Sequence, residues 1–197
     1  MNFLAHFHLS GENELIAIGN FLGDFIRGSE LHNLPLTVQK GVHLHRFIDQ
    51  YTDSHPVVRE LNKMLVPHFA KYAPVVSDIY FDYFLASNFS TYSDISLRDY
   101  THNVYDCMER NLSFFTKRAD RFYHFMIERD IFFEYGNKDG LQHVFNGLSN
   151  RATFDSKMEN GVEVLRKNEA VMRGMFEQFY PELQKASFDY LQELTNK

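Results

Sequence analysis

The chain has 197 residues, 44% of them apolar, which suits one globular domain over residues 1–197 and excludes an intrinsically disordered protein. Its net charge of −6 argues against a broad basic surface for nucleic acid, and the lack of a run of 18 apolar residues predicts no membrane-spanning helix. The single cysteine, Cys107, excludes an internal disulfide and a thiolate metal cluster, so we expect a cytoplasmic protein.

Three early segments predict helices. Residues 2–9 alternate in polarity and fit a strand or a short helix, and the helical character of the other segments favours the helix. Apolar residues in the segment 61–69 recur at the i, i+3, i+4 and i+7 positions of an amphipathic helix. Residues 79–85 are apolar on nearly every side, which is typical of a helix at the centre of a fold.

Two later segments complete the helical pattern. Residues 120–133 predict an aromatic-rich helix, and residues 157–180 predict one long helix. We expect the long helix to end before Pro181, because proline disfavours helical geometry in the residue that precedes it. The breaks between the helical segments are too short to separate domains, so the sequence predicts a single all-α helical bundle.

Polar residues within these apolar segments are the main functional signal, because buried charges are usually paired or bind a metal. Asn20, Asp24 and Arg27 follow i, i+4 and i+7 spacing and would share one face of a helix. Asp24 is therefore a candidate metal ligand. The alternative is an ion pair between Asp24 and Arg27 at the end of that helix.

The segment 41–56 carries three histidines, two aspartates and one arginine. His45 and Asp49 would lie about 40° apart around a helix, a suitable geometry for two ligands of one metal ion. His43 and Arg46 would point elsewhere, so we do not expect one ion to bind both His43 and His45. The alternative is a solvated polar face with His45 in a core hydrogen bond.

Asp78 and Asp82 lie four residues apart in the most apolar part of the chain. Two carboxylates on one helix face repel each other unless a cation lies between them, so both are candidate metal ligands. Asp78 could instead stabilise the first turn of its helix through the helix dipole. His6 and His8 near the N-terminus could reach the same site, or they could form core or capping hydrogen bonds.

Together these segments supply carboxylates and imidazoles from separate helices. Mixed oxygen and nitrogen ligation suits Mn²⁺, Fe²⁺ or Mg²⁺ better than a structural zinc site. Such an ion activates water and neutralises charge on a phosphoryl oxygen, so the pattern predicts a metal-dependent phosphohydrolase. Arg27, Arg46 and Lys40 are then candidates for holding the phosphate.

Several segments that span the chain in order carry a family resemblance. They are MNFLAHFHL at the N-terminus, GNFLGDFIRG at 19–28, GVHLHRFIDQYTD at 41–53, DIYFDYFL at 78–85, VFNGL at 144–148 followed by Arg151, and QFYP at 178–181. Taken together they resemble the bacterial acyl carrier protein phosphodiesterases. A match of this kind is more specific than any single motif in the chain.

The resemblance implies an all-α, HD-domain-like fold related to the HD-type metal phosphohydrolases. It also implies manganese-dependent cleavage of the phosphodiester that joins 4′-phosphopantetheine to a serine of holo-acyl carrier protein, a reaction linked to fatty acid biosynthesis. Helix geometry within the matching segments suggests as metal ligands Asp24, His45, Asp49, Asp78 and Asp82. Arg27 or Arg46 would hold the phosphate, and His43 is a candidate for the general acid.

The carrier protein expected from this resemblance is acidic, as this chain is, so docking requires a local basic face. Candidate basic residues are Lys117, Arg118 and Arg121, or Lys40, Arg46, Arg59 and Lys63. One alternative function is an HD-like phosphohydrolase of a nucleotide or other small phosphodiester, with an aromatic pocket formed by Tyr80, Tyr83, Phe47 and Tyr51. Another is a non-catalytic helical module that binds a carrier protein. The sequence leaves the oligomeric state open.

Overall fold

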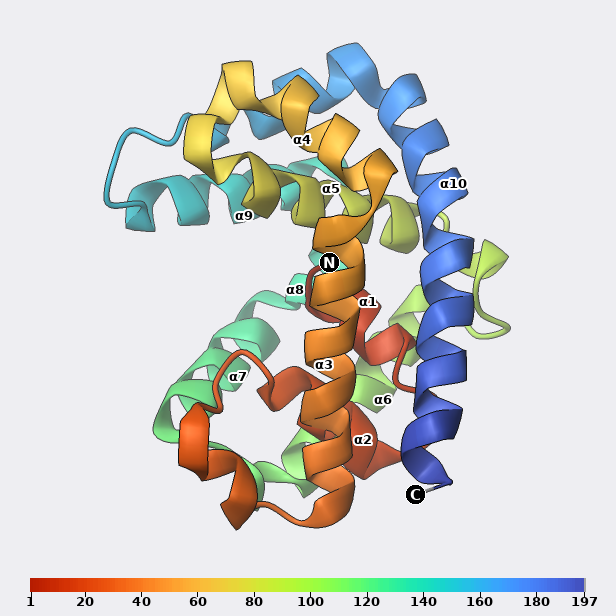
Figure 1. Cartoon of the computed structure of the whole chain (residues 1–197). Coiled ribbons are helices and arrows are strands. Elements are labelled where there is room, and N and C mark those ends of the chain that lie inside the picture. The colour runs from red at the N-terminus through yellow and green to blue at the C-terminus, as the bar shows by residue number, and fades with distance from the viewer. Residues whose placement is uncertain (197) are drawn as a thin grey trace.

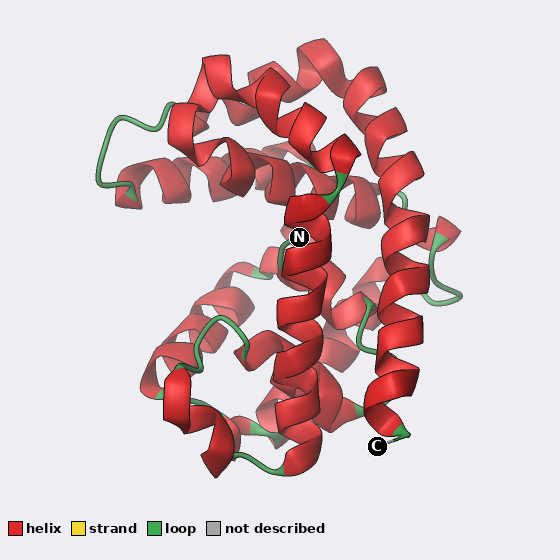
Figure 2. Ribbon diagram, viewed as in Figure 1, coloured by secondary structure: helices red, strands yellow, loops and turns green. Residues whose placement is uncertain are grey.

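The computed structural model describes residues 1–196, which contain helices and loops and no strand (Figure 2). The α-helices are α1 (Phe3–His8), α2 (Glu14–Leu22), α3 (Leu36–Ser54), α4 (Pro56–Phe69), α5 (Ala73–Ser87), α6 (Leu97–Arg110), α7 (Lys117–Arg129), α8 (Ile131–Glu134), α9 (Lys138–Arg151) and α10 (Gly161–Thr195). Short 3-10 turns connect several of them, including η1 (Gly28–Asn33). The predicted all-α fold is therefore confirmed, and the likeness to HD domains stays a prediction.

Helix α3 runs through the middle of the molecule beside α10, and the start of the chain lies next to it (Figure 1). Helices α2 and α3 cross with unusually close backbones. A Cβ atom added to Gly19 would lie 2.0 Å from the carbonyl oxygen of Val38 and 2.9 Å from the Cα of Gly41. Only glycine permits this approach, and it holds the turn after α2 against the side of α3.

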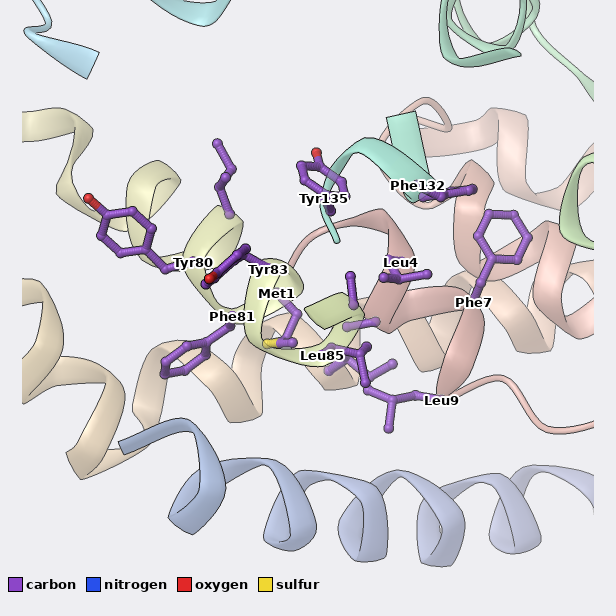
Figure 3. Packing of buried hydrophobic residues seen from close by; sticks show 14 of the residues in the cluster. Met1, Leu4, Phe7, Leu9, Tyr80, Phe81, Tyr83, Leu85, Phe132 and Tyr135 are labelled. Carbon is purple, nitrogen blue, oxygen red and sulfur yellow. The ribbon is translucent and has the colours of Figure 1, made fainter. Parts of the chain in front are cut away.

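Helix α5 forms the apolar centre expected from its composition (Figure 3). The side chains of Tyr80, Phe81 and Phe84 are fully buried, and Phe81 stacks on Phe179 of α10. Helix α1 packs against α2 and α5, and its Leu4 is also fully buried. The first helix of the chain is therefore an internal element, although it has only six residues.

The predicted helix at 2–9 is confirmed by α1, while three other predicted helices differ from the structure. Helix α2 ends at Leu22, so Asp24 and Arg27 lie beyond it and do not share a helix face. The chain turns there, and both Phe25 and Ile26 enter the core. The burial of these two side chains explains why the turn is preferred to another helical turn.

Helix α10 continues through Pro181 rather than ending before it. Proline inside a helix removes one backbone hydrogen bond and crowds the preceding turn, at a cost of about 3 kcal/mol. Phe179, Tyr180 and Leu183 flank the proline and are fully buried. Burial of such side chains contributes roughly 1.5–3 kcal/mol each, which is enough to offset the cost.

The aromatic segment predicted at 120–133 also divides. Helix α7 ends at Arg129, and Asp130 adopts a left-handed backbone conformation with φ of 46°. The chain then starts α8 in a new direction, and Phe132 enters the core. The segment 120–133 therefore forms two helices instead of one, and residues of both line the pocket described in the next subsection.

Candidate active site

A pocket of about 900 Å³ opens between two parts of the fold. One part of its lining comes from α1, the turn after α2, α3 and α5, and the other comes from α7, α8 and α9 (Figure 1). The polar residues on the first part are Asn2, His6, Asp24, His45, Asp49, Asp53 and Asp78. The second part contributes Phe122, Phe125, Glu128, Arg129, Glu134, Tyr135, His143 and Arg151.

His45 on α3 lies between two carboxylates. Its Nε2 is 3.1 Å from Oδ2 of Asp49, one helical turn later, and 3.5 Å from Oδ1 of Asp24. The ring reaches this position because residue 23 is glycine, where an added Cβ would lie 2.2 Å from Cγ of His45. Nδ1 of His45 is buried with no hydrogen-bond partner, whereas Nε2 faces the two carboxylates. Nε2 is therefore the nitrogen available to a ligand.

His6 on α1 completes this group. Its Nε2 lies 3.2 Å from Oδ1 of Asp49, and its ring stacks on that of His45 with centroids 4.3 Å apart. Its other nitrogen, Nδ1, lies 2.7 Å from Oδ1 of Asn20. The amide nitrogen of Asn20 already donates to the His6 carbonyl and to Ser10 Oγ, so Oδ1 must accept and Nδ1 of His6 carries the hydrogen. In neutral His6, the lone pair on Nε2 therefore faces a carboxylate.

The side chains of His6, Asp24, His45 and Asp49 shift one another's pKa values. Burial works against ionisation of His45, but hydrogen bonds and charges from Asp24 and Asp49 raise its pKa to about 9. Burial would also raise the pKa values of Asp24 and Asp49, yet the neighbouring imidazoles hold both below the usual range. The pKa of His6 is lowered by burial and by the charge of His45. The carboxylates are therefore ionised at neutral pH, and His6 is neutral.

These residues fit a divalent cation. The ligand atoms of His6, His45 and Asp49 all lie within 4.8 Å of one another. Ligands about 2.1 Å from an octahedral ion lie about 3 Å apart, close to the separations of 3.1 and 3.2 Å around Asp49. A cation would also relieve the repulsion between the lone pair of His6 and the carboxylate of Asp49. Oδ1 of Asp24 lies beside this group, 3.5 Å from Nε2 of His45.

Asp78 and Asp82 lie beside this group and contact the start of the chain. Oδ1 of Asp78, which lines the pocket, is 3.0 Å from the amino nitrogen of Met1. Asp82 is fully buried and accepts hydrogen bonds from the backbone nitrogens of Leu4 and Ala5, at 2.9 and 3.3 Å. Burial raises the pKa of Asp82 to about 7. Asp82 thus anchors the first turn of α1, and through it the position of His6.

Other predicted site residues lie elsewhere. Arg27, Arg46 and His43 are not among the residues that line the pocket, and neither is Lys40. The aromatic residues suggested for a nucleotide pocket do not line it either. These are Tyr80, Tyr83, Phe47 and Tyr51. The pocket also has lining side chains that the sequence did not assign to a site, namely Phe122, Phe125, Arg129, His143 and Arg151.

The family model described as acyl carrier protein phosphodiesterase matches residues 1–183. The chain belongs to this family. A protein named acyl carrier protein phosphodiesterase from Escherichia coli O157:H7 is 31% identical over 187 residues, which cover 93% of this chain and 95% of the relative. A protein of the same name from Escherichia coli O6:H1 is 30% identical over 184 residues, with the same coverage of both chains. No solved structure has a significant match.

Membership confirms the resemblance seen in the sequence and, with it, the prediction of a phosphodiesterase. The matched region contains the whole pocket, from Met1 to Arg151. None of the helices within residues 1–196 combines the length and the apolar composition needed to cross a lipid bilayer.

Proposed function

We propose that the protein is a metal-dependent phosphodiesterase that releases 4′-phosphopantetheine from holo-acyl carrier protein. The observation that supports the metal is the convergence of His6, His45 and Asp49, with Asp24 beside them, at one end of a large pocket. Membership of the acyl carrier protein phosphodiesterase family supports the substrate. An arrangement of this kind suits hydrolysis of a phosphate ester better than a purely structural role.

The mixed nitrogen and oxygen ligands favour Mn²⁺, with Fe²⁺ or Mg²⁺ as alternatives. When bound, such an ion supplies activation of water and neutralisation of charge on a phosphoryl oxygen. We propose His6, His45, Asp49 and Asp24 as its ligands. Asp78, which the sequence ranked with them, remains a further proposed ligand, while the hydrogen bonds of Asp82 support a role in holding α1.

The chain's own residues orient the site. Asn20 holds His6 with Nε2 toward Asp49, and Gly23 leaves room for the ring of His45. The apolar lining of the pocket includes Phe122 and Phe125, which are half-buried. These rings would exclude water from one side of the pocket and leave contact surface for the pantetheine arm.

Helix α7 connects this pocket to a surface that suits an acidic partner. Lys117, Arg118 and Arg121 are exposed near the start of α7, whose Phe122 and Phe125 line the pocket. We propose this part of α7 as the face on which the carrier protein docks, because opposite charges accelerate encounter. The single cysteine supports the further proposal of a cytoplasmic location.

The test is incubation of the protein with holo-acyl carrier protein and Mn²⁺, followed by intact-protein mass spectrometry. We expect the carrier to lose the mass of 4′-phosphopantetheine, and we expect a chelator or Asp49→Asn to prevent the loss. Arg166→Met serves as a variant control, because Arg166 is an exposed residue of α10 that does not line the pocket. An intact holo-carrier, with Mn²⁺ shown to be bound, would contradict the proposed substrate and favour a small phosphodiester instead.

A further inference from the structure

Two arginines lie in the part of the pocket formed by α7, α8 and α9. Arg129 is the last residue of α7 and Arg151 is the last residue of α9, and both line the pocket. Both are exposed, and neither forms an ion pair with a carboxylate within residues 1–196. Their charges are therefore available to a ligand that enters the pocket.

Two contacts hold the guanidinium group of Arg151 in place. Its Nε donates to the carbonyl oxygen of Gly147 at 3.0 Å, and its Cζ lies 5.2 Å from the centre of the Phe125 ring. Its terminal nitrogens have no hydrogen-bond partner in the described part of the chain. A guanidinium fixed in this way offers two parallel donors, the arrangement that binds a phosphate oxygen pair.

Arg129 approaches the same aromatic ring, with its Cζ 6.0 Å from the centre of Phe125. Two cations beside one ring repel each other, and an anion between them relieves that repulsion. The acidic residues of this wall do not take that role. Glu134 faces His143, with 3.6 Å between Oε2 and Nδ1, and Glu128 forms no ion pair with either arginine among residues 1–196.

The charge of Arg151 also reaches toward the start of the chain. Burial is the main cause of the raised pKa of Tyr135, and the positive charge of Arg151 is among the groups that oppose it. The Tyr135 hydroxyl accepts a hydrogen bond of 2.7 Å from Asn2, next to the Met1–Asp78 contact. Arg151, Tyr135 and the proposed metal ligands thus line the same pocket.

We propose that Arg151, assisted by Arg129, binds the non-bridging phosphoryl oxygens of the substrate. This inference rests on the proposed function and names the residues that hold its phosphate group. It replaces Arg27 and Arg46, the candidates suggested by the sequence, because neither of them lines the pocket. Phe125 acts as the shared platform that positions both guanidinium groups.

The test measures binding rather than turnover. Calorimetric titration with 4′-phosphopantetheine would compare the Mn²⁺-loaded wild type with Arg151→Met, Arg151→Lys and the control Arg166→Met. Arg166 is an exposed arginine of α10 outside the pocket. We expect Arg151→Met to raise the Kd about 10- to 100-fold, since a charge-assisted pair is lost. Arg151→Lys should give a smaller rise, and Arg166→Met none.

Pantetheine, which lacks the phosphate, should bind the wild type and Arg151→Met equally. Unchanged Mn²⁺ affinity and thermal unfolding would show that Arg151→Met is folded. A Kd for 4′-phosphopantetheine equal to that of the wild type would overturn the inference, whether or not holo-carrier is cleaved. If holo-carrier stays intact but Arg151→Met weakens the binding of inorganic phosphate, the phosphate site stands and the proposed substrate does not.

Discussion

The side-chain oxygen of Asn20 lies 2.7 Å from Nδ1 of His6, and this contact determines which nitrogen of His6 faces the pocket. Asn20 is fully buried on α2, while His6 belongs to α1. The partner of a metal-binding histidine fixes its tautomer and its ring orientation, and its loss typically lowers metal affinity about 10- to 100-fold. The contact between α1 and α2 thus determines that Nε2 of His6, rather than Nδ1, faces Asp49.

Replacing Asn20 by Leu should weaken Mn²⁺ binding about 10- to 100-fold, because Nδ1 of His6 loses its acceptor. The buried donors and acceptors left behind should also lower the free energy of unfolding by about 1–3 kcal/mol. Calorimetric titration with Mn²⁺ and urea denaturation would measure the two effects. Arg166→Met, at an exposed position of α10 outside the pocket, should leave the affinity near that of the wild type. Equal affinities for Asn20→Leu and the wild type would contradict this role.

Replacing Gly23 by Ala should disrupt the site by displacing a ligand. The new methyl group would lie 2.2 Å from Cγ of His45. To relieve this clash, either the imidazole ring or the backbone that joins α2 to α3 must move. We expect Mn²⁺ affinity and turnover to fall at least tenfold, with a stability loss of about 1–3 kcal/mol. Gly174→Ala is the matched control, because nothing lies within 4 Å of its added Cβ. That helical site should gain roughly 0.5–1 kcal/mol.

The metal-free protein should lose stability between pH 7 and pH 9. Burial disfavours the charged form of His45, but Asp24 and Asp49 raise its pKa to about 9. Because unfolded histidine titrates near 6.5, the protonated ring stabilises the folded state at low pH, and this contribution disappears as the pH approaches 9. Urea denaturation with chelator at several pH values would measure it. His45→Gln should show a flatter profile, and parallel profiles for both proteins would refute the assignment.

Over the same range, Mn²⁺ affinity should rise with pH. The ion must displace the proton that His45 carries in the metal-free protein, so binding becomes easier as that proton is lost. Titrations at pH 7, 8 and 9 should show a progressive decrease in Kd, with about one proton released per ion at pH 7. Proton release can be measured by repeating the calorimetry in buffers of different ionisation enthalpy. A Kd independent of pH would mean that His45 does not bind the ion.

Charge reversal at the start of α7 should affect the protein substrate selectively. Lys117→Glu combined with Arg118→Glu should raise KM for holo-acyl carrier protein roughly tenfold at low salt, with little change in kcat. The difference should shrink as salt screens the charges. The matched control, Arg166→Glu with Lys167→Glu on α10, changes the net charge equally at another surface. If both double variants raise KM to the same extent, α7 is not the docking face.

Short-range spacing in the sequence predicted part of the site. His45 and Asp49 are four residues apart on one helix, and the helix alone brings His45 Nε2 to 3.1 Å from Asp49. The position of Asp24 relative to His45 depends on the α2–α3 crossing, which periodicity does not encode. His6 was a candidate with a core hydrogen bond as the alternative, and the structure shows both contacts: Nδ1 faces Asn20 in the core and Nε2 faces Asp49 in the pocket.

Long-range contacts account for what the sequence did not predict. Two carboxylates at i and i+4 look alike in the sequence, yet buried Asp82 accepts from the backbone of α1 while half-buried Asp78 contacts Met1. Arg151 reaches the pocket only because α9 packs beside α8 and its side chain lies against Phe125. Pro181 stays helical because tertiary burial outweighs its local preference, an effect that no sequence window contains.

The hydrogen bond between Leu4 and Asp82 joins positions 78 residues apart, and this has a consequence for synthesis on the ribosome. The proposed ligands His6, Asp24, His45 and Asp49 all emerge before Asp82 does. At about 5–20 residues per second, α1 waits roughly 4–16 s for the acceptor of its first turn. During that interval the nascent chain exposes its histidines and carboxylates without the framework that arranges them, so the proposed metal site can form only once α5 has been made.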